Sequence, residues 1–474
     1  MFNPPEQDQA SRHSSRKVCN LRNAAGSSID NGIVSFVDNG GTTRRLSIAP
    51  QTYLGGPSGA TTNYYHGQVT AQVRPTWNIR VTGGLNVNPT FWYVTPGTGS
   101  TMARGVGTTA KQFGQSLYGN ILATHTGSHG TLLFGTETRG DRASTATRNA
   151  TNWLNRDTAT NVTLQAYGKT IDQSGYAQYQ NTFWDRLNVV AGGRFDYWKT
   201  YDGGNQATAT SPILNFGVRS QHAFTGKLAA NYTLPHERHL RGSIGNAFRG
   251  PSVYERYYNF VIGSTKYVAN PDEKPEHLLA YEAGVQHTFR NRYSFEATGY
   301  TNRVTDLIYR TTDLVLDPTG ATKVLTNAGK SRTWGTELSV REKVLSWLDF
   351  RQGYTYTNSI ILDNPSLPTT VGKTLPYLPD HILTYQATAT PNRFIVNWTG
   401  RYVSPVYSTD TNTDTTRGVP GSYNLFFEMD GTVTYRATKN VSLVANADNM
   451  LDRQYFFYYR SLGRSIFGGV RLHF

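Results

Sequence analysis

The chain has 474 residues, a length that would ordinarily divide into about three domains but that large all-β barrels occupy as one. Charged residues make up 16% of the chain, against about 25% in an ordinary soluble domain, so the usual charged shell is absent. The 46 basic and 32 acidic residues leave a net charge of +14, but the basic residues are scattered and form none of the long runs of nucleic-acid-binding tails.

The N-terminal stretch, residues 1–30, is polar and predicts no regular structure. It contains no apolar core of about 7–15 residues, so a signal peptide is missing from this chain. The single cysteine, Cys19, excludes an intrachain disulfide and a cysteine-based zinc site. Apolar runs throughout the chain are only a few residues long, whereas a transmembrane helix needs about 18, which excludes helical membrane spans.

From residue 31 onward the sequence predicts β-strands. A first hairpin is expected over 32–49, because Asp38-Asn39-Gly40-Gly41 has the chemistry of a tight turn. Apolar or aromatic residues then alternate with polar ones, which is typical of strands with two different faces. The strands are expected to be about ten residues long, close to the 9–11 residues that a tilted strand needs to cross a bilayer. Clear examples are 187–197, 383–389, 394–402 and 425–435.

Two features favour strands whose apolar face meets lipid and whose polar face lines a lumen, although alternation alone also permits a soluble sandwich. Aromatic residues gather near strand ends, as in interfacial girdles, and short connections alternate with long ones. The long ones fall near 49–66, 88–113, 140–174, 200–219, 250–277, 303–331, 358–380, 403–422 and 449–464. The predicted fold is therefore all-β: a large antiparallel up-and-down transmembrane barrel over residues 31–474, with about 18–19 strands. Charges expected on the lumenal face are Arg194, Asp196, Glu296, Arg351, Arg401, Glu428 and Asp430.

Several ordered motifs resemble the C-terminal barrel of the TonB-dependent outer-membrane receptors. Residues 440–474 are similar to the final two strands of that family, with an Asn449, Leu451-Asp452, Tyr455 element and a Gly463-Arg464 pair. By this resemblance the terminal Phe474 is a signal for the barrel-assembly machinery. The other matching segments are 175–198, 246–258, 270–289, 327–340 and 375–386.

The family has a barrel of about 22 strands, preceded by a plug domain and a TonB box. No segment of this chain resembles a plug or a box, so the chain looks like a plug-less fragment that is incompetent for energised transport. A gap or a poorly paired seam is expected between the strands near 32–49 and 464–474.

The resemblance implies an outer-membrane receptor of a Gram-negative bacterium that takes up a scarce nutrient, and no enzyme. A ferric siderophore is the expected ligand; cobalamin, another metal chelate and a passive porin-like channel are the alternatives. The implied partners are TonB for the full-length parent, outer-membrane lipid and lipopolysaccharide, and the barrel-assembly machinery. No cofactor, metal site or nucleic acid is expected, and the protein is expected to be a monomer.

Aromatic residues and arginines gather where the long loops begin. Aromatic faces and guanidinium groups suit a large, partly planar, anionic ligand such as a ferric siderophore. The alternative for each residue is a place in the aromatic girdle or in the rim against lipopolysaccharide. The candidate ligand contacts are Trp92, Tyr93, Tyr201, Tyr254, Arg256, Tyr257, Tyr258, Tyr455, Phe456, Tyr459 and Arg460.

Overall fold

The computed structural model describes most of the chain as β-strands. No helix in the described residues is long and apolar enough to cross a membrane. The helical elements there are α1 (Val253–Tyr257) and the short turns η2 (Arg156–Thr158) and η3 (Pro368–Thr370). Residues 1–28, the turn at 38–41 and Phe474, on which three of the expectations depend, lie outside the described part. The described residues are 29–30, 33–37, 42–47, 58–101, 104–262, 265–290, 292–312, 317–327 and 329–473.

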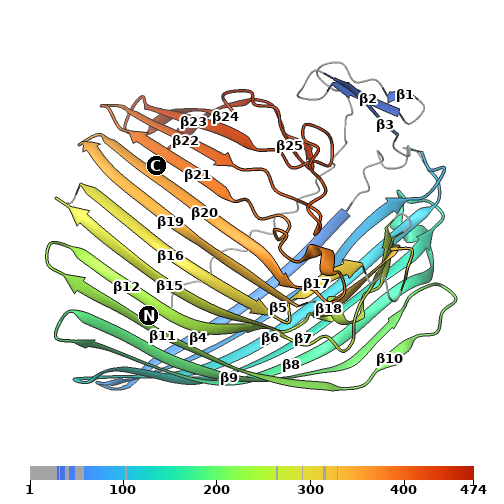
Figure 1. Cartoon of the computed structure of the whole chain (residues 1–474), viewed down its shortest axis with the longest axis horizontal. Coiled ribbons are helices and arrows are strands. Elements are labelled where there is room, and N and C mark those ends of the chain that lie inside the picture. Colours follow the sequence, from blue (N-terminus) through green and yellow to red (C-terminus); the bar gives the residue numbers. More distant parts are fainter. Residues whose placement is uncertain are drawn as a thin grey trace.

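One antiparallel β-barrel dominates the structure, which confirms the predicted fold class. Each barrel strand pairs with the next barrel strand along the chain, except that β9 pairs with both β10 and β11 (Figure 1). Short turns join the strands at one end, and the longer connections, with the small strands β17, β18 and β25, lie at the other. The barrel strands are β4 (Ser58–Arg74), β5 (Trp77–Pro96), β6 (Gly107–Gly127), β7 (Gly130–Ala150), β8 (Ala159–Phe183), β9 (Leu187–Gln206), β10 (Leu214–Phe216), β11 (Arg219–Leu234), β12 (Arg238–Arg249), β15 (Glu276–Phe289), β16 (Tyr293–Thr305), β19 (Lys330–Leu345), β20 (Leu348–Asp363), β21 (His381–Ala389), β22 (Phe394–Val403), β23 (Phe426–Arg436), β24 (Val441–Asp448) and β27 (Ser465–Leu472).

The strands of the N-terminal half are longer than the sequence predicts. From β4 to β9 they have 17 to 25 residues, whereas β21 to β24 have 8 to 11. Much of the loop expected over 140–174 is therefore strand, in β7 and β8. Its polar residues, mainly Thr and Asn, give no apolar alternation, because this part of each strand extends beyond the apolar band and both of its faces are wet.

In the described residues three small sheets accompany the barrel. The predicted hairpin over 32–49 forms from β2 (Ile33–Val37) and β3 (Thr43–Ser47), but it pairs with β1 (Ile29–Asp30) in a sheet of its own. The first barrel strand of the described residues is β4, whereas the sequence predicts a barrel that starts at residue 31. The other two sheets lie in the long loops: β13 (Phe260–Ile262), β14 (Thr265–Val268), β17 (Ile308–Thr312) and β18 (Thr322–Asn327) form one, and β25 (Phe456–Phe457) and β26 (Tyr459–Arg460) form the other.

The two faces of the barrel differ as alternation predicts. Large apolar side chains such as Leu383, Phe394 and Trp398 stay 37–44% exposed on the outer face, where lipid would cover them. The opposite face carries ion pairs: Arg194 Nη2 lies 2.8 Å from Asp196 Oδ1. Apolar residues outside and charges inside are the arrangement of a transmembrane barrel.

The first and last barrel strands, β4 and β27, meet at a seam. Strands β10 and β11 both pair with β9 and form one broken strand, so the 18 barrel strands amount to 17 spanning strands. Because all described pairs of barrel strands are antiparallel, consecutive spanning strands alternate in direction. The first and the seventeenth, β4 and β27, therefore run in the same direction. Both are exposed along nearly their whole length, with Val69 69% and Ile466 75% exposed. The seam between β4 and β27, and not one near 32–49, is thus the weakest junction of the wall.

Candidate ligand-binding site at the barrel mouth

The loop between β12 and β15 folds back into the mouth of the barrel. It starts with α1, whose first turn carries a capping box: the Ser252 hydroxyl accepts from the Glu255 N–H, and the Glu255 carboxylate accepts from the Ser252 N–H. Such reciprocal bonds satisfy N–H groups that a helix start leaves free. The helix packs against β8 and β9, so this loop is held on the barrel wall.

Two buried side chains of α1 fasten the loop. Arg256 Nη2 donates to Gln221 Oε1 at 2.6 Å and to the Glu273 carbonyl at 3.1 Å, and its side chain is almost fully buried. Tyr257 is fully buried and stacks on Phe216 with 5.2 Å between ring centroids. Both were predicted as ligand contacts; their burial gives them the role of anchors in this structure.

An aromatic group with one arginine lies next to these anchors. The rings of Tyr254 and Tyr258 are 4.5 Å apart, and Phe260 stacks on Tyr267 at 4.5 Å. The Arg310 guanidinium lies 5.0 Å from the centroids of both Phe260 and Tyr267, in cation–π range. We call Tyr93, Tyr254, Tyr258, Phe260, Tyr267 and Arg310 the mouth cluster; Tyr93 belongs to it because its hydroxyl interacts with that of Tyr258.

Two loops that are distant in sequence supply this cluster, apart from Tyr93, which lies on β5. Strand β14, from the loop after β12, pairs in parallel with β18, from the loop after β16. Strand β17, which carries Arg310, pairs with β18, and β13, which carries Phe260, pairs with β14. The four-stranded sheet therefore fixes Arg310 over Phe260 and Tyr267.

The electrostatics of the mouth cluster favour neutral phenols around one cation. Tyrosine hydroxyls are ordinarily protonated at neutral pH, and burial raises the pKa of Tyr254 and, more strongly, of Tyr258 further above that pH. Burial lowers the pKa of Arg310, but a guanidinium titrates so high that it remains charged. Hydroxyl donors, aromatic faces and one cation together suit an anionic ligand with flat groups.

A buried carboxyl lies beside the anchors. Glu273 is fully buried, and burial raises its pKa to about 7. Its Oε1 accepts from Asn270 Nδ2 at 3.1 Å, while its Oε2 has no hydrogen-bond partner. At neutral pH both the charged and the neutral form of this carboxyl are therefore populated. It lies in the loop that carries Tyr254, Tyr258, Phe260 and Tyr267 of the mouth cluster.

A second aromatic group lies on the C-terminal side of the mouth. Tyr455 stacks on Phe426 at 4.3 Å, and its hydroxyl donates to Glu428 Oε2 at 2.6 Å. Arg401 lies 5.2 Å over the Phe426 ring. Phe456 is buried, whereas Tyr459 is 77% exposed and Arg460 Nε donates to Gln454.

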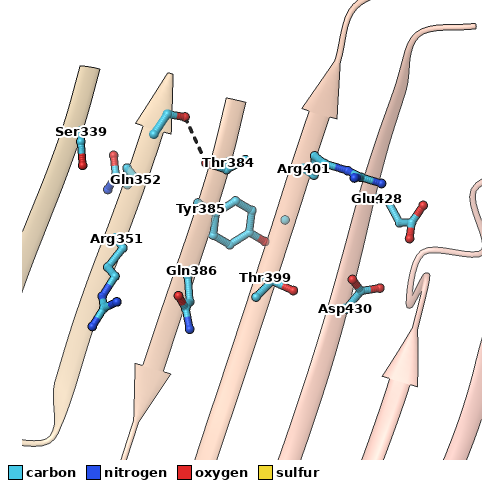
Figure 2. A pocket seen from close by; sticks show the side chains of 12 residues that line it. Ser339, Arg351, Gln352, Thr384, Tyr385, Gln386, Thr399, Arg401, Glu428 and Asp430 are labelled. Atoms are coloured by element: carbon cyan, nitrogen blue, oxygen red, sulfur yellow. Dashed lines mark hydrogen bonds between the residues drawn. The ribbon is translucent and has the colours of Figure 1, made fainter. Parts of the chain in front are cut away.

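Below this group the lumenal wall is hollowed. The hollow has a volume of about 530 Å³ and is lined by polar side chains of five neighbouring strands, β19 to β23. Figure 2 shows Arg401 and Glu428, cross-strand partners on β22 and β23, with Asp430 further along β23. A polar, charged wall of this kind suits the passage of a hydrophilic solute.

The structure brings Tyr93, Tyr254 and Tyr258 together, but it places two of the other candidates elsewhere. Trp92 neighbours Tyr93 and alternates to the outer face, where the Arg156 guanidinium lies 5.0 Å over its ring. Tyr201 is also separate, with Lys169 Nζ 5.8 Å from its ring centroid. These outer positions are compatible with the alternative to ligand contact, which is a place in the rim against lipopolysaccharide.

Sequence reasoning missed Arg310, Phe260 and Tyr267, which lie in the middle of long loops. Their strands, β13, β14 and β17, have three to five residues, too short for an alternation signal. In the described part of the chain no group of three or more His, Cys, Asp or Glu side chains could hold a metal ion.

Comparisons with known proteins match most of the barrel. The family model for the β-barrel of TonB-dependent receptor-like proteins matches residues 20–450. The vitamin B12 transporter BtuB of Vibrio cholerae is 25% identical over 235 residues, which cover 49% of this chain and 34% of the transporter. The chain thus spans about a third of the length of that relative.

Solved structures of the same shape have far lower sequence identity. The ferric yersiniabactin uptake receptor FyuA from Yersinia pestis matches with a TM-score of 0.70 at 15% identity, covering 88% of this chain and 62% of FyuA. The copper transporter OprC matches with a TM-score of 0.70 at 16% identity, covering 93% of this chain and 68% of OprC. These structural matches support the fold alone.

Proposed function

Because this chain belongs to the TonB-dependent receptor β-barrel family, we propose that it forms the barrel of an outer-membrane receptor that takes up a ferric siderophore. The observation that carries the choice of ligand is Arg310, held at 5.0 Å over two aromatic rings at the mouth. Ferric siderophores combine flat chelating groups with negative charge, and both features match this arrangement.

In the proposed mechanism the ligand meets the mouth cluster first. Flat chelating groups stack on Tyr254, which is 44% exposed, and their negative charge pairs with Arg310. The protonated phenol hydroxyls donate hydrogen bonds to chelate oxygens. The hollow lined by Arg401, Glu428 and Asp430 then offers polar contacts along the wall. In this proposal TonB supplies the energy for transport.

Cobalamin is the second candidate, and the match to BtuB favours it. Cobalamin is also large and carries a phosphate, so Arg310 could serve it too. Cobalamin differs from a ferric siderophore because its corrin ring carries amide groups around the metal. These amides need hydrogen-bond partners rather than a cation. The relative affinities of the two ligands for the chain therefore discriminate between them.

The test is equilibrium binding of two ligands to the refolded full chain in detergent. A ferric catecholate chelate and cyanocobalamin are titrated separately, and bound ligand is measured by its visible absorbance after gel filtration. The siderophore proposal expects binding of the chelate at least tenfold tighter than that of cyanocobalamin. Tighter binding of cyanocobalamin would transfer the proposal to that ligand. Binding of neither, with unassisted conductance in a planar bilayer, would favour a passive channel.

A further inference from the structure

Two pairs of like charges face each other across neighbouring strands on the outer surface of the barrel. In the registers of the strands, Arg142 of β7 lies directly opposite Lys169 of β8. Arg303 of β16 likewise lies directly opposite Arg332 of β19. Like charges in this position destabilise a sheet unless something of opposite charge lies between them.

Alternation places both pairs on the lipid-facing side. On β7, Leu132 and Phe134 occupy the same face as Arg142 and are 38% and 42% exposed. On β19, Trp334 and Leu338 share the face of Arg332 and are 41% and 38% exposed. The cations are thus continuous with the apolar band of the outer surface.

The two pairs lie at the outer edge of that band. Arg142 is the thirteenth residue of β7 and Arg303 the eleventh of β16, both counted from the short-turn end. A tilted strand crosses the hydrocarbon with about 9–11 residues, so these residues reach the interface on the side of the long loops. Aromatic rings accompany them, as is typical of that depth: the Arg142 guanidinium lies 5.4 Å over Phe113, and Trp334 is next to Arg332 on the same face.

A like-charge pair on the lumenal face provides a comparison. Arg341 and Arg351 are also cross-strand partners, and both lie 3.4 Å from Asp349, which compensates them. On the outer face Asp202 pairs with Lys169 at 2.8 Å. For Arg142, Arg303 and Arg332 no carboxylate of the described residues lies within ion-pair distance, and Arg332 Nε is buried without a hydrogen-bond partner. Lys169 therefore has a carboxylate partner, whereas Arg142, Arg303 and Arg332 lack the anion that the lumenal pair has.

We propose that these two pairs bind the phosphate groups of phosphorylated glycolipids in the outer leaflet. A phosphate oxygen group between two opposed cations removes their repulsion and gains charge-assisted hydrogen bonds, for which guanidinium is well shaped. The lipid chains then cover the apolar band below, beside Phe134 and Leu338. This inference does not depend on which ligand enters the mouth.

The test uses the refolded full chain in neutral detergent and diphosphoryl lipid A as the probe, with bound lipid counted by native mass spectrometry. Wild type is expected to bind it at least tenfold more tightly than the same lipid without phosphates, since each surface cation strengthens binding to anionic lipid several-fold. Neutralising the outer pairs, in a chain with Arg142→Gln, Lys169→Gln, Arg303→Gln and Arg332→Gln, is expected to abolish this preference. The charge-preserving pair Arg303→Lys and Arg332→Lys is expected to retain it.

The matched control neutralises the lumenal pair with Arg341→Gln and Arg351→Gln, and it is expected to bind like wild type. Folding of each variant is checked by its β circular-dichroism signal. An unchanged preference in the outer variant, or an equal loss in the lumenal control, would overturn the proposal. Competition by inorganic phosphate at the lipid's own concentration would also overturn it, because it would identify a site for the free anion.

Discussion

Tyr257 lies so close to Gly203 that a β-carbon built on this glycine would be 2.3 Å from Cζ of the tyrosine ring. The fully buried ring thus occupies the space that a side chain at position 203 of β9 would fill. The loop that carries the mouth cluster is seated on the barrel wall at this contact.

The first prediction concerns this seat. Gly203→Ala is expected to displace Tyr257 and weaken loop closure by about 1–3 kcal/mol, the usual cost of overpacking. Faster proteolytic cleavage within 250–276 would report the opened loop. The control is Gly175→Ala in β8, where a β-carbon would meet nothing within 4 Å. Equal cleavage in the two variants would contradict the assignment of Tyr257 as an anchor.

The second prediction concerns pH. Burial raises the pKa of Glu273 from 4.5 to about 7, so the closed loop holds a proton that an opened loop releases between these values. Loop closure is therefore strongest at pH 4.5 and below, weakens by about 1.4 kcal/mol per unit as pH rises towards 7, and is constant above. Amide exchange of residues 253–275, corrected for intrinsic rates, measures this slope.

Glu273→Gln is expected to remove the slope, because the amide does not titrate. Asp272→Asn, which breaks only the exposed ion pair with Arg219, is expected to keep it. A slope that survives in Glu273→Gln would assign the pH dependence to another group.

The third prediction tests which face meets lipid. Leu228→Arg places a charge on the apolar face of β11, where Leu228 is 51% exposed, and is expected to cost about 2–4 kcal/mol. Ala229→Arg places the same charge on the lumenal face, next to the hollow lined by Asn231 and Glu282, and is expected to be nearly neutral. Unfolding of both variants from phospholipid vesicles in urea measures the difference. A larger cost for Ala229→Arg than for Leu228→Arg would contradict the assignment of the two faces to lipid and lumen.

The fourth prediction concerns the seam. Seventeen spanning strands leave β4 and β27 parallel, and both are exposed on each face. Their amides are expected to exchange with solvent faster than those of β7, which has an antiparallel register on each side, because edge amides open locally at low cost. Equal protection of β4, β27 and β7 in detergent would show a well-paired seam.

The sequence predicted the barrel where alternation is strong. Runs such as 383–389 and 394–402 carry apolar residues at every second position, and they form β21 and β22 close to their expected bounds. It underestimated the strands from β4 to β9, because beyond the bilayer both faces are wet and backbone pairing extends a strand without any apolar signal. The sequence also placed the seam at the wrong strand. The turn chemistry at 38–41 predicts a hairpin, but it does not predict which strand that hairpin pairs with.

The candidate site was predictable only in part. Tyr254 and Tyr258 follow a strand end in a recognisable motif, which is why they could be chosen. Their partners Phe260, Tyr267 and Arg310 come from short loop strands whose pairing depends on tertiary contacts between two loops. Arg256 and Tyr257 are of the same residue types as the exposed candidates. Only their buried hydrogen bonds and packing reveal them as anchors.

The central claim is that the mouth cluster binds an anionic metal chelate through Arg310. Its most direct test is the dissociation constant of a ferric catecholate chelate for wild type, Arg310→Gln and Arg417→Gln, measured in detergent at one salt concentration. Arg417 is the matched control, because it lies 5.7 Å over Tyr407, outside the cluster. The account predicts binding weakened by about 10- to 100-fold in Arg310→Gln, the usual loss for one charged hydrogen bond, and unchanged in Arg417→Gln. Equal affinity of Arg310→Gln and wild type would contradict it.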